Sequence, residues 1–136
     1  MTLLWPLPPE YTTVTTEYAA IDAEHPNGHR GIDIAAPLGV GVLAVTGGIV
    51  RMAIHEGEGD PLQDELGDFV VLRGSDDGTD YLYCHLSQIG VRAGQMVARG
   101  AILGLVGSTG FSTGPHLHFG QWRDGVCQRP DLEVPA

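Results

Sequence analysis

The sequence predicts an all-β domain with little helix. Short apolar runs rich in β-branched residues recur along the chain, and clusters of Gly, Asp and Asn that favour turns separate them. No segment keeps the 3.6-residue apolar period of an amphipathic helix. With 136 residues and 43% hydrophobic residues, the chain is long enough for one domain with a buried core.

The N-terminal part is expected to be extended. Residues 1–20 are rich in Pro, Thr and Tyr, and we expect one strand around Thr12–Thr16. Ala19–Asn27 has the composition of a loop. We expect residues 1–25 to form an extended arm that packs on a single domain, and this domain to span residues 26–136.

Strands follow the loop at regular spacing. The first is half-buried, because Ile32 and Ile34 point to one face and Asp33 to the other. The later apolar runs are short, β-branched and bounded by turn residues, and each is expected to be a strand. These runs are Val40–Val45, Gly48–Ile54, Phe69–Leu72, Tyr81–His85, Ile102–Val106 and His116–Trp122.

One inter-strand segment, Glu56–Asp68, is strongly acidic and reads EGEGDPLQDELGD. A solvated loop is the simplest interpretation. The spacing of its carboxylates does not match an EF-hand, which argues against a calcium site. Electrostatic selection of a cationic substrate stays open.

Composition excludes several classes of function. The net charge is −10, with 17 acidic and 7 basic residues, which disfavours binding to nucleic acid or to anionic membranes. There is no Lys, so lysine nucleophiles and lysine-attached cofactors are excluded. No apolar run approaches the ~20 residues of a membrane span, and residues 1–6 show no signal-peptide pattern. Cys84 and Cys127 are expected to be buried free thiols, although a bridge between them stays open.

The chemistry is concentrated in histidines near strand-like segments. In an extended strand His116 and His118 project to one face, while Leu117 and Phe119 point to the core. His29 precedes Asp33 by four residues. His85 ends a strand in which strict alternation places it on one face with Tyr81 and Tyr83.

A metal would explain so many imidazoles in a Val-, Ile- and Leu-rich sheet, because burying them without partners is costly. Neutral imidazoles together with a carboxylate suit Zn²⁺, and catalytic zinc sites use three protein ligands. The chain has too few Cys for a structural zinc cage, and it lacks the His-Glu-x-x-His helix of the zincins.

Three motifs identify a resemblance to the lysostaphin/LytM-type zinc endopeptidases of the M23 family. HRGIDIAAPLG at 29–39 is similar to the family's H-x-G-x-D motif, and YCHLS at 83–87 to its Y-x-H-L motif. GSTG at 107–110, followed by STGPHLHF at 112–119, is similar to its last motif. The resemblance runs from about residue 26 to residue 122. It implies an antiparallel β-sheet or sandwich of the LytM type (a duplicated hybrid motif, or barrel-sandwich), with a groove over the sheet.

The resemblance also implies roles for five residues. One Zn²⁺ per chain would be bound by His29, Asp33 and His118. His85 and His116 would line the catalytic water, and the sequence does not say which of them acts as the base.

Two further residues are candidates for substrate contact. Tyr83 would share the face of His85, with packing in the core or at the rim as the alternative. Asp68 stands where the family usually has Asn after Gly. Gly120 stands where many members have an acidic residue, so the support given by that carboxylate would be absent here or come from another residue.

The resemblance implies hydrolysis of peptide bonds in bacterial peptidoglycan, in cross-links or in stem or bridge peptides. The alternative is a non-catalytic relative that binds or regulates a cell-wall hydrolase. A third reading, a biotinyl- or lipoyl-type carrier suggested by the spacing of Val and Gly in residues 91–104, fails for want of a lysine. The expected place of action is the cell wall, periplasmic or extracellular, or a phage lysin or virion component. A monomer is the default expectation.

Overall fold

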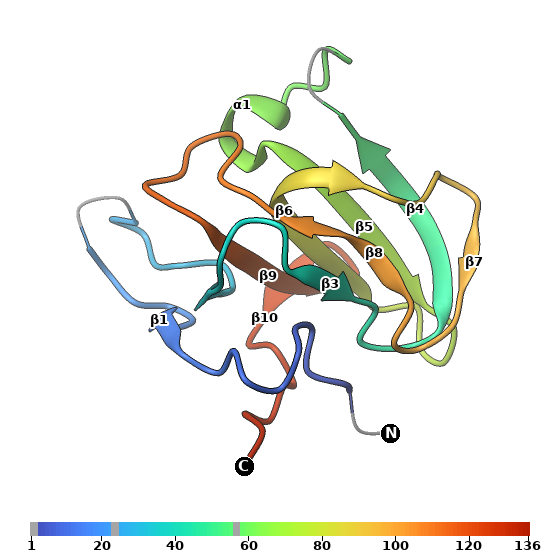
Figure 1. Ribbon diagram of the computed structural model, residues 1–136, viewed down its shortest axis with the longest axis horizontal. Coiled ribbons are helices and arrows are strands. Elements are labelled where there is room, and N and C mark those ends of the chain that lie inside the picture. The colour runs from blue at the N-terminus through green and yellow to red at the C-terminus, as the bar shows by residue number, and fades with distance from the viewer. Residues whose placement is uncertain (1–2, 23–24, 56–57) are drawn as a thin grey trace.

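The computed structural model describes residues 3–22, 25–55 and 58–136, apart from the side chains of residues 63 and 64. Within this part the chain forms ten strands of one antiparallel sheet and a single four-residue helix (Figure 1). The prediction of an antiparallel all-β fold with little helix is confirmed. The strands are β1 Val14–Thr16, β2 Ile32–Ala35, β3 Gly41–Leu43, β4 Gly48–Ile54, β5 Asp68–Gly74, β6 Asp80–Ile89, β7 Met96–Val97, β8 Ile102–Val106, β9 His116–Arg123 and β10 Val126–Gln128.

The main path of the sheet runs β1-β2-β9-β6-β5-β4-β7. The long strand β6 changes partner along its length. Its first half, Asp80 to Cys84, pairs with β9, and its second half, from Leu86, pairs with β8. β8 in turn pairs with β3. β6 therefore connects the broad part of the sheet to the β3–β8 pair (Figure 1). His85 lies between Cys84 and Leu86, at the point where β6 changes partner.

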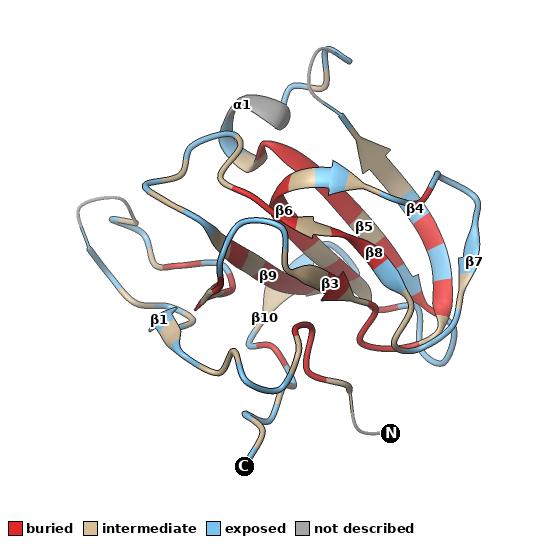
Figure 2. Ribbon diagram, viewed as in Figure 1, coloured by how far each residue is buried: buried red, intermediate tan, exposed pale blue. Residues whose placement is uncertain are grey.

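Alternation along each strand separates core from surface. Ile34, Leu117 and Phe119 are fully buried, as the sequence predicts, while Asp33 and His118 point to the opposite face of the same strands. Figure 2 shows the buried residues along β5, β6 and β9 at the centre of the molecule. The sheet thus has one face in the core and one that can carry a site.

The N-terminal segment contributes to this core. Trp5 and Leu7 are both buried, and Leu43 donates a backbone hydrogen bond of 2.8 Å to the carbonyl oxygen of Pro6. β1 adds to the edge of the sheet beside β2, close to the expected strand at Thr12–Thr16.

The acidic segment contains the helix, α1 Gln63–Leu66, which the sequence analysis did not predict. Glu56 lies outside the described residues. The described part of the segment is mostly exposed, and an Asp60 oxygen accepts a hydrogen bond from the Leu62 backbone N–H at 2.9 Å. No helix of the described chain has the length and apolarity needed to cross a membrane.

Candidate active site

Three side chains converge on the exposed face of the β2–β9 pair. Asp33 lies directly opposite His118 in the sheet, and its Oδ1 is 2.8 Å from His118 Nδ1. His29, just before β2, places its Nε2 3.3 Å from the same oxygen. One ligand atom from each of the three lies within 4.8 Å of the others, and within the described residues this is the one such group that could hold a metal.

Local backbone structure fixes the first ligand. His29 Nδ1 lies 3.2 Å from the carbonyl oxygen of Glu17, which can accept its proton and thereby direct Nε2 towards Asp33. Gly31 makes the close approach of β2 to β9 possible. A Cβ at this position would lie 2.2 Å from the Phe119 carbonyl oxygen and 3.0 Å from the His118 ring, so only glycine fits.

The carboxylate at the centre of this group is ionised, which suits a divalent cation. Burial alone would raise the pKa of Asp33, but hydrogen bonds to His118 and His29 hold it far below its usual value, so the carboxylate is ionised. Burial lowers the pKa of His118 and outweighs the opposing hydrogen bond to Asp33. Burial alone would lower the pKa of His29, but the hydrogen bond and charge of Asp33, together with the Glu17 carbonyl and the charge of Asp22, raise it, so a metal that binds here displaces a proton. An ionised carboxylate between two imidazoles fits the donor set of a three-ligand zinc site.

A second pair of histidines lies beside the first group. The rings of His85 and His116 are 4.9 Å apart, and His116 Nε2 is 3.7 Å from Asp33 Oδ1. Each Nδ1 faces a backbone acceptor, the Thr109 carbonyl at 2.7 Å for His85 and the Gly114 carbonyl at 2.8 Å for His116. Burial lowers the pKa of His85 to about 4, so this imidazole is neutral at neutral pH and its Nε2 is a proton acceptor.

The backbone conformation of His85 interrupts the side-chain alternation that the sequence predicts for β6. His85 has φ 63°, a left-handed conformation that is rare for non-glycine residues, and the register shifts on both sides of it. Tyr81 and Tyr83 therefore face the core, not the side of His85 as strict alternation predicts. A bulge of this kind redirects a side chain at a functional site.

The two candidates for substrate contact do not lie in the groove. Tyr83 is fully buried, and its hydroxyl accepts a hydrogen bond from the Val45 backbone N–H at 3.1 Å, so it is a core residue. Asp68 is also buried, lines neither described cavity and leaves its Oδ1 without a hydrogen-bond partner in the structure. Cys84 and Cys127 are both free thiols as expected. Cys84 is buried, but Cys127 is only partly buried, contrary to the expectation.

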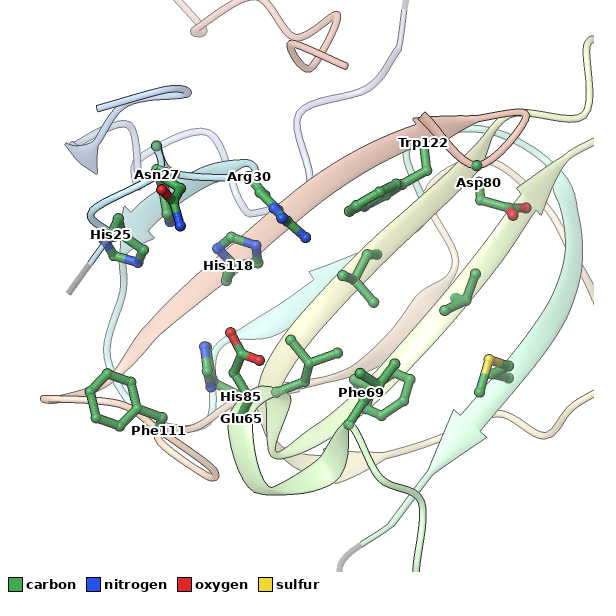
Figure 3. A pocket seen from close by; sticks show the side chains of 18 of the residues that line it. His25, Asn27, Arg30, Glu65, Phe69, Asp80, His85, Phe111, His118 and Trp122 are labelled. Atoms are coloured by element: carbon green, nitrogen blue, oxygen red, sulfur yellow. The ribbon is translucent and has the colours of Figure 1, made fainter. Parts of the chain in front are cut away.

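Two cavities meet at the histidines. The larger, of about 710 Å³, extends over the exposed face of β4, β5, β6 and β9 (Figure 3). The smaller, of about 330 Å³, is lined by hydroxyl groups of β1 and of the loop before β9. His25, His29, His85, Phe111 and His118 line both cavities. The metal-ligand group thus lies within an open groove that has different chemistry on its two sides.

The groove contains several residues that sequence reasoning missed. Phe111 is 63% exposed on the rim, and its backbone N–H donates to the Glu65 carbonyl of α1 at 3.1 Å. Arg30 and Trp122 line the larger cavity on either side of β9 residue Gly120. Position supplied a signal for Trp122, because it follows His118 by four residues on the same strand and so shares its face. No comparable pattern marks Phe111, which lies in a loop.

Comparison with known proteins supports this description. The model named "Peptidase family M23" matches residues 27–130 of the chain. The chain is similar to peptidoglycan DD-endopeptidase ShyA of Vibrio cholerae, at 40% identity over 93 residues, which are 67% of this chain and 19% of that protein. It is 41% identical over 91 residues to DD-carboxypeptidase/endopeptidase Mpg of Neisseria meningitidis, again 67% of this chain and 19% of that protein. The aligned region is therefore about one fifth of the length of these relatives.

Solved structures share the fold. A zinc-containing peptidase from Vibrio cholerae superposes with a TM-score of 0.81 at 26% identity, over 98% of this chain and 41% of that one. The catalytic domain of lysostaphin from Staphylococcus simulans gives a TM-score of 0.76 at 28% identity, over 89% and 90% of the two chains.

Proposed function

Because this chain belongs to peptidase family M23, we propose that it is a zinc-dependent endopeptidase that hydrolyses peptide bonds in bacterial peptidoglycan. The observation that carries the proposal is the convergence of His29, Asp33 and His118 beside His85 and His116 in one open groove. Such a groove can hold an extended peptide with its scissile bond against all five residues.

The names of its relatives support this substrate. ShyA is a peptidoglycan DD-endopeptidase and Mpg a DD-carboxypeptidase/endopeptidase. We infer that the bond cleaved here is a peptide cross-link or a stem or bridge peptide bond, and that the place of action is the cell wall. One structural neighbour is prophage-encoded, so a phage lysin is included.

In this proposal His29, Asp33 and His118 would hold the metal. When bound there, Zn²⁺ supplies Lewis acidity towards the scissile carbonyl and towards water. Before a metal binds, Asp33 is already ionised despite its burial, because hydrogen bonds from His118 and His29 lower the pKa of its carboxylate. The Glu17 carbonyl keeps the His29 ring in one orientation.

We assign the role of general base to His85. Its Nδ1–H is held by the Thr109 carbonyl and its lowered pKa keeps Nε2 unprotonated, so Nε2 can take the proton from the attacking water. His116 Nδ1–H is held by the Gly114 carbonyl in the same way. His116 Nε2, in its protonated form, donates to the oxyanion that develops on the scissile carbonyl. The proton taken by His85 passes to the leaving amine.

The alternative is a non-catalytic module that binds or regulates a wall hydrolase. It has less support, because such a module would not require the five residues to lie together, whereas here all five converge. The decisive experiment digests purified sacculi of several peptidoglycan types with zinc-loaded protein and identifies the released fragments by mass spectrometry. Zinc-loaded protein that releases no fragment from any wall type would favour the binding module.

Three variants resolve the roles. His118→Ala should lose stoichiometric zinc and all activity. His85→Ala should retain zinc and lose activity, because His85 is not a ligand. His55→Ala provides the matched control, since His55 is exposed and lines neither cavity, and it should behave as wild type. Tight stoichiometric zinc in His118→Ala would contradict the ligand assignment.

A further inference from the structure

We propose that the part of the larger cavity around Trp122, beside the metal site, binds a free carboxylate group of the substrate through the guanidinium groups of Arg30 and Arg51. This inference rests on the proposed function and specifies its substrate. It assigns a specificity site to one side of the scissile bond.

Arg30 provides the first positive charge. It lies between His29 and Gly31 and lines the larger cavity, and Figure 3 shows its side chain between His118 and the ring of Trp122. The residue is exposed, and no described acidic side chain forms an ion pair with it. Its guanidinium is therefore available to a ligand in the groove.

Arg51 provides the second positive charge, next to Asp80 and on the other side of Trp122 from Arg30. Its Nη1 lies 2.7 Å from Asp80 Oδ2, and Arg73 Nε binds the other oxygen of Asp80 at 3.0 Å. One carboxylate shared by two guanidinium groups leaves one positive charge in excess. Asp80 lies directly opposite Trp122 in the sheet, so this excess charge lies next to the indole.

Between the two arginines the surface is apolar. Trp122 stands between Arg30 and Asp80 in Figure 3. Leu82, Val71 and Met52 lie opposite one another on β6, β5 and β4 and line the same cavity. A guanidinium beside an apolar floor binds a carboxylate more strongly than one in bulk water, because the local dielectric constant is lower. The planar donor fork of Arg also matches the geometry of a carboxylate.

The charge distribution gives this part of the cavity its selectivity. The chain carries −10 overall, and two of its seven arginines line this one cavity. The described acidic residues of the lining are Asp80, which is already paired, and Glu65 on α1, which Figure 3 shows beside His85. A peptide with a free carboxylate is thus attracted towards Trp122 and repelled near Glu65, which favours one direction in the groove.

The test uses synthetic peptides that represent cross-linked peptidoglycan stems. Each free carboxylate in turn is replaced by a carboxamide, so that shape is kept and charge is removed. For one position, zinc-loaded wild type should cleave the carboxylate form with a kcat/KM about tenfold above that of the amide form, the size expected for one charge-assisted hydrogen bond.

The variants locate the effect. Arg30→Gln and Arg51→Gln should each reduce this preference several-fold, with zinc content unchanged and little change in kcat/KM on the amide form. Arg92→Gln is the matched control, since Arg92 is exposed and lines neither cavity; it should retain the full preference. Equal cleavage of both forms at every position, or equal slowing of both forms by Arg30→Gln, would overturn the proposal.

A binding measurement separates this inference from the proposed function. Calorimetric titration of zinc-loaded His85→Ala with the same peptides should show about tenfold tighter binding of the carboxylate form, and Arg30→Gln in this background should abolish the difference. If the wild type cleaves nothing, the proposed function fails and the titration still decides the carboxylate site. Equal binding of both forms would overturn the carboxylate site while leaving peptide cleavage intact.

Discussion

At the scale of single residues, Gly31 shows why the first ligand motif has glycine between its two ligands. The missing Cβ lets β2 approach both the Phe119 carbonyl oxygen and the ring of His118. A side chain here would push against backbone, which cannot give way cheaply. The glycine therefore serves the geometry of the metal site and not a turn.

We predict that Gly31→Ala separates β2 from β9 and weakens zinc binding at least tenfold. The free energy of unfolding should fall by about 2 kcal/mol, the usual cost of overpacking. Competition with a chromogenic chelator and urea unfolding measure the two effects. Gly90→Ala is the control, since the nearest atom to its added Cβ is 3.8 Å away. Unchanged zinc affinity in Gly31→Ala would contradict the steric role.

Tyr83, in the second motif, has a structural role in the core, and a substitution can distinguish this role from contact with the substrate. Because its hydroxyl accepts the Val45 N–H in the core, Tyr83→Phe leaves a buried donor unpaired. The free energy of unfolding should fall by about 1–3 kcal/mol, while zinc content and kcat/KM on peptide substrates stay at wild-type values. Chemical denaturation and peptide hydrolysis provide the two measurements. A selective rise in KM would restore Tyr83 as a substrate contact.

The candidate site could be predicted where ordinary strand geometry applies. His116 and His118 share a face, and Ile32 and Ile34 flank Asp33 on the opposite one, because β2 and β9 alternate regularly. At His85 this reasoning failed for Tyr81 and Tyr83. The left-handed backbone at His85 follows from the change of partners along β6, and that change depends on distant strands. Arg30 and Phe111 were not predicted as groove residues for a similar reason. Only the tertiary structure brings them to the groove, and no periodic pattern in the sequence marks such residues.

At the scale of elements, the N-terminal segment is anchored to the domain by apolar side chains that are buried in its core. Leu7 is 1% exposed and belongs to the same apolar cluster as Ile34, Leu117 and Phe119. The segment is thus tied to the core behind β2 and β9, the two strands that carry Asp33 and His118. We infer that the arm and the metal site share their stability.

We predict that Leu7→Ala lowers the free energy of unfolding by about 3 kcal/mol, the typical cost of a buried Leu-to-Ala change. Because the arm and the metal site share the same core, the melting temperature of the zinc-loaded form should fall as well. Thermal unfolding followed by circular dichroism measures it. Leu38→Ala, at a position that is 66% exposed, should cost less than about 0.5 kcal/mol. A loss of that small size for Leu7→Ala would show that the arm is dispensable.

Longer strands were easier to predict than short ones. All six apolar runs proposed after residue 37 contain a strand, whereas β7, with two residues, and α1, with four, carry too few residues for a period. The hairpin from β9 to β10 did have a signal. Asp124-Gly125, with φ of 51° and 76°, is the Asp-Gly dipeptide that favours a tight turn between antiparallel strands.

At the scale of the whole molecule, the metal site joins segments distant in sequence and should act on global stability. We predict that saturating zinc raises the melting temperature by roughly 10 °C, because ligand at about 1,000 times Kd adds about 4 kcal/mol to a domain of this size. Calorimetry with and without chelator measures the shift. Magnesium, a poor match for imidazole ligands, should have little effect, and Asp33→Asn should abolish the zinc effect. An equal shift in Asp33→Asn would place zinc elsewhere.

The pairing of β2 with β9 also determines when the site can form. Asp33 and His118 lie 85 residues apart in sequence, and the strand that carries His118 joins between β2 and β6. A growing chain on the ribosome therefore holds its first two ligands without the third until β9 has been made and has entered the sheet. Such distant pairings are slow to form. The metal site is therefore complete only after β9 has paired with β2, so the topology of the sheet makes it depend on a contact between distant parts of the chain.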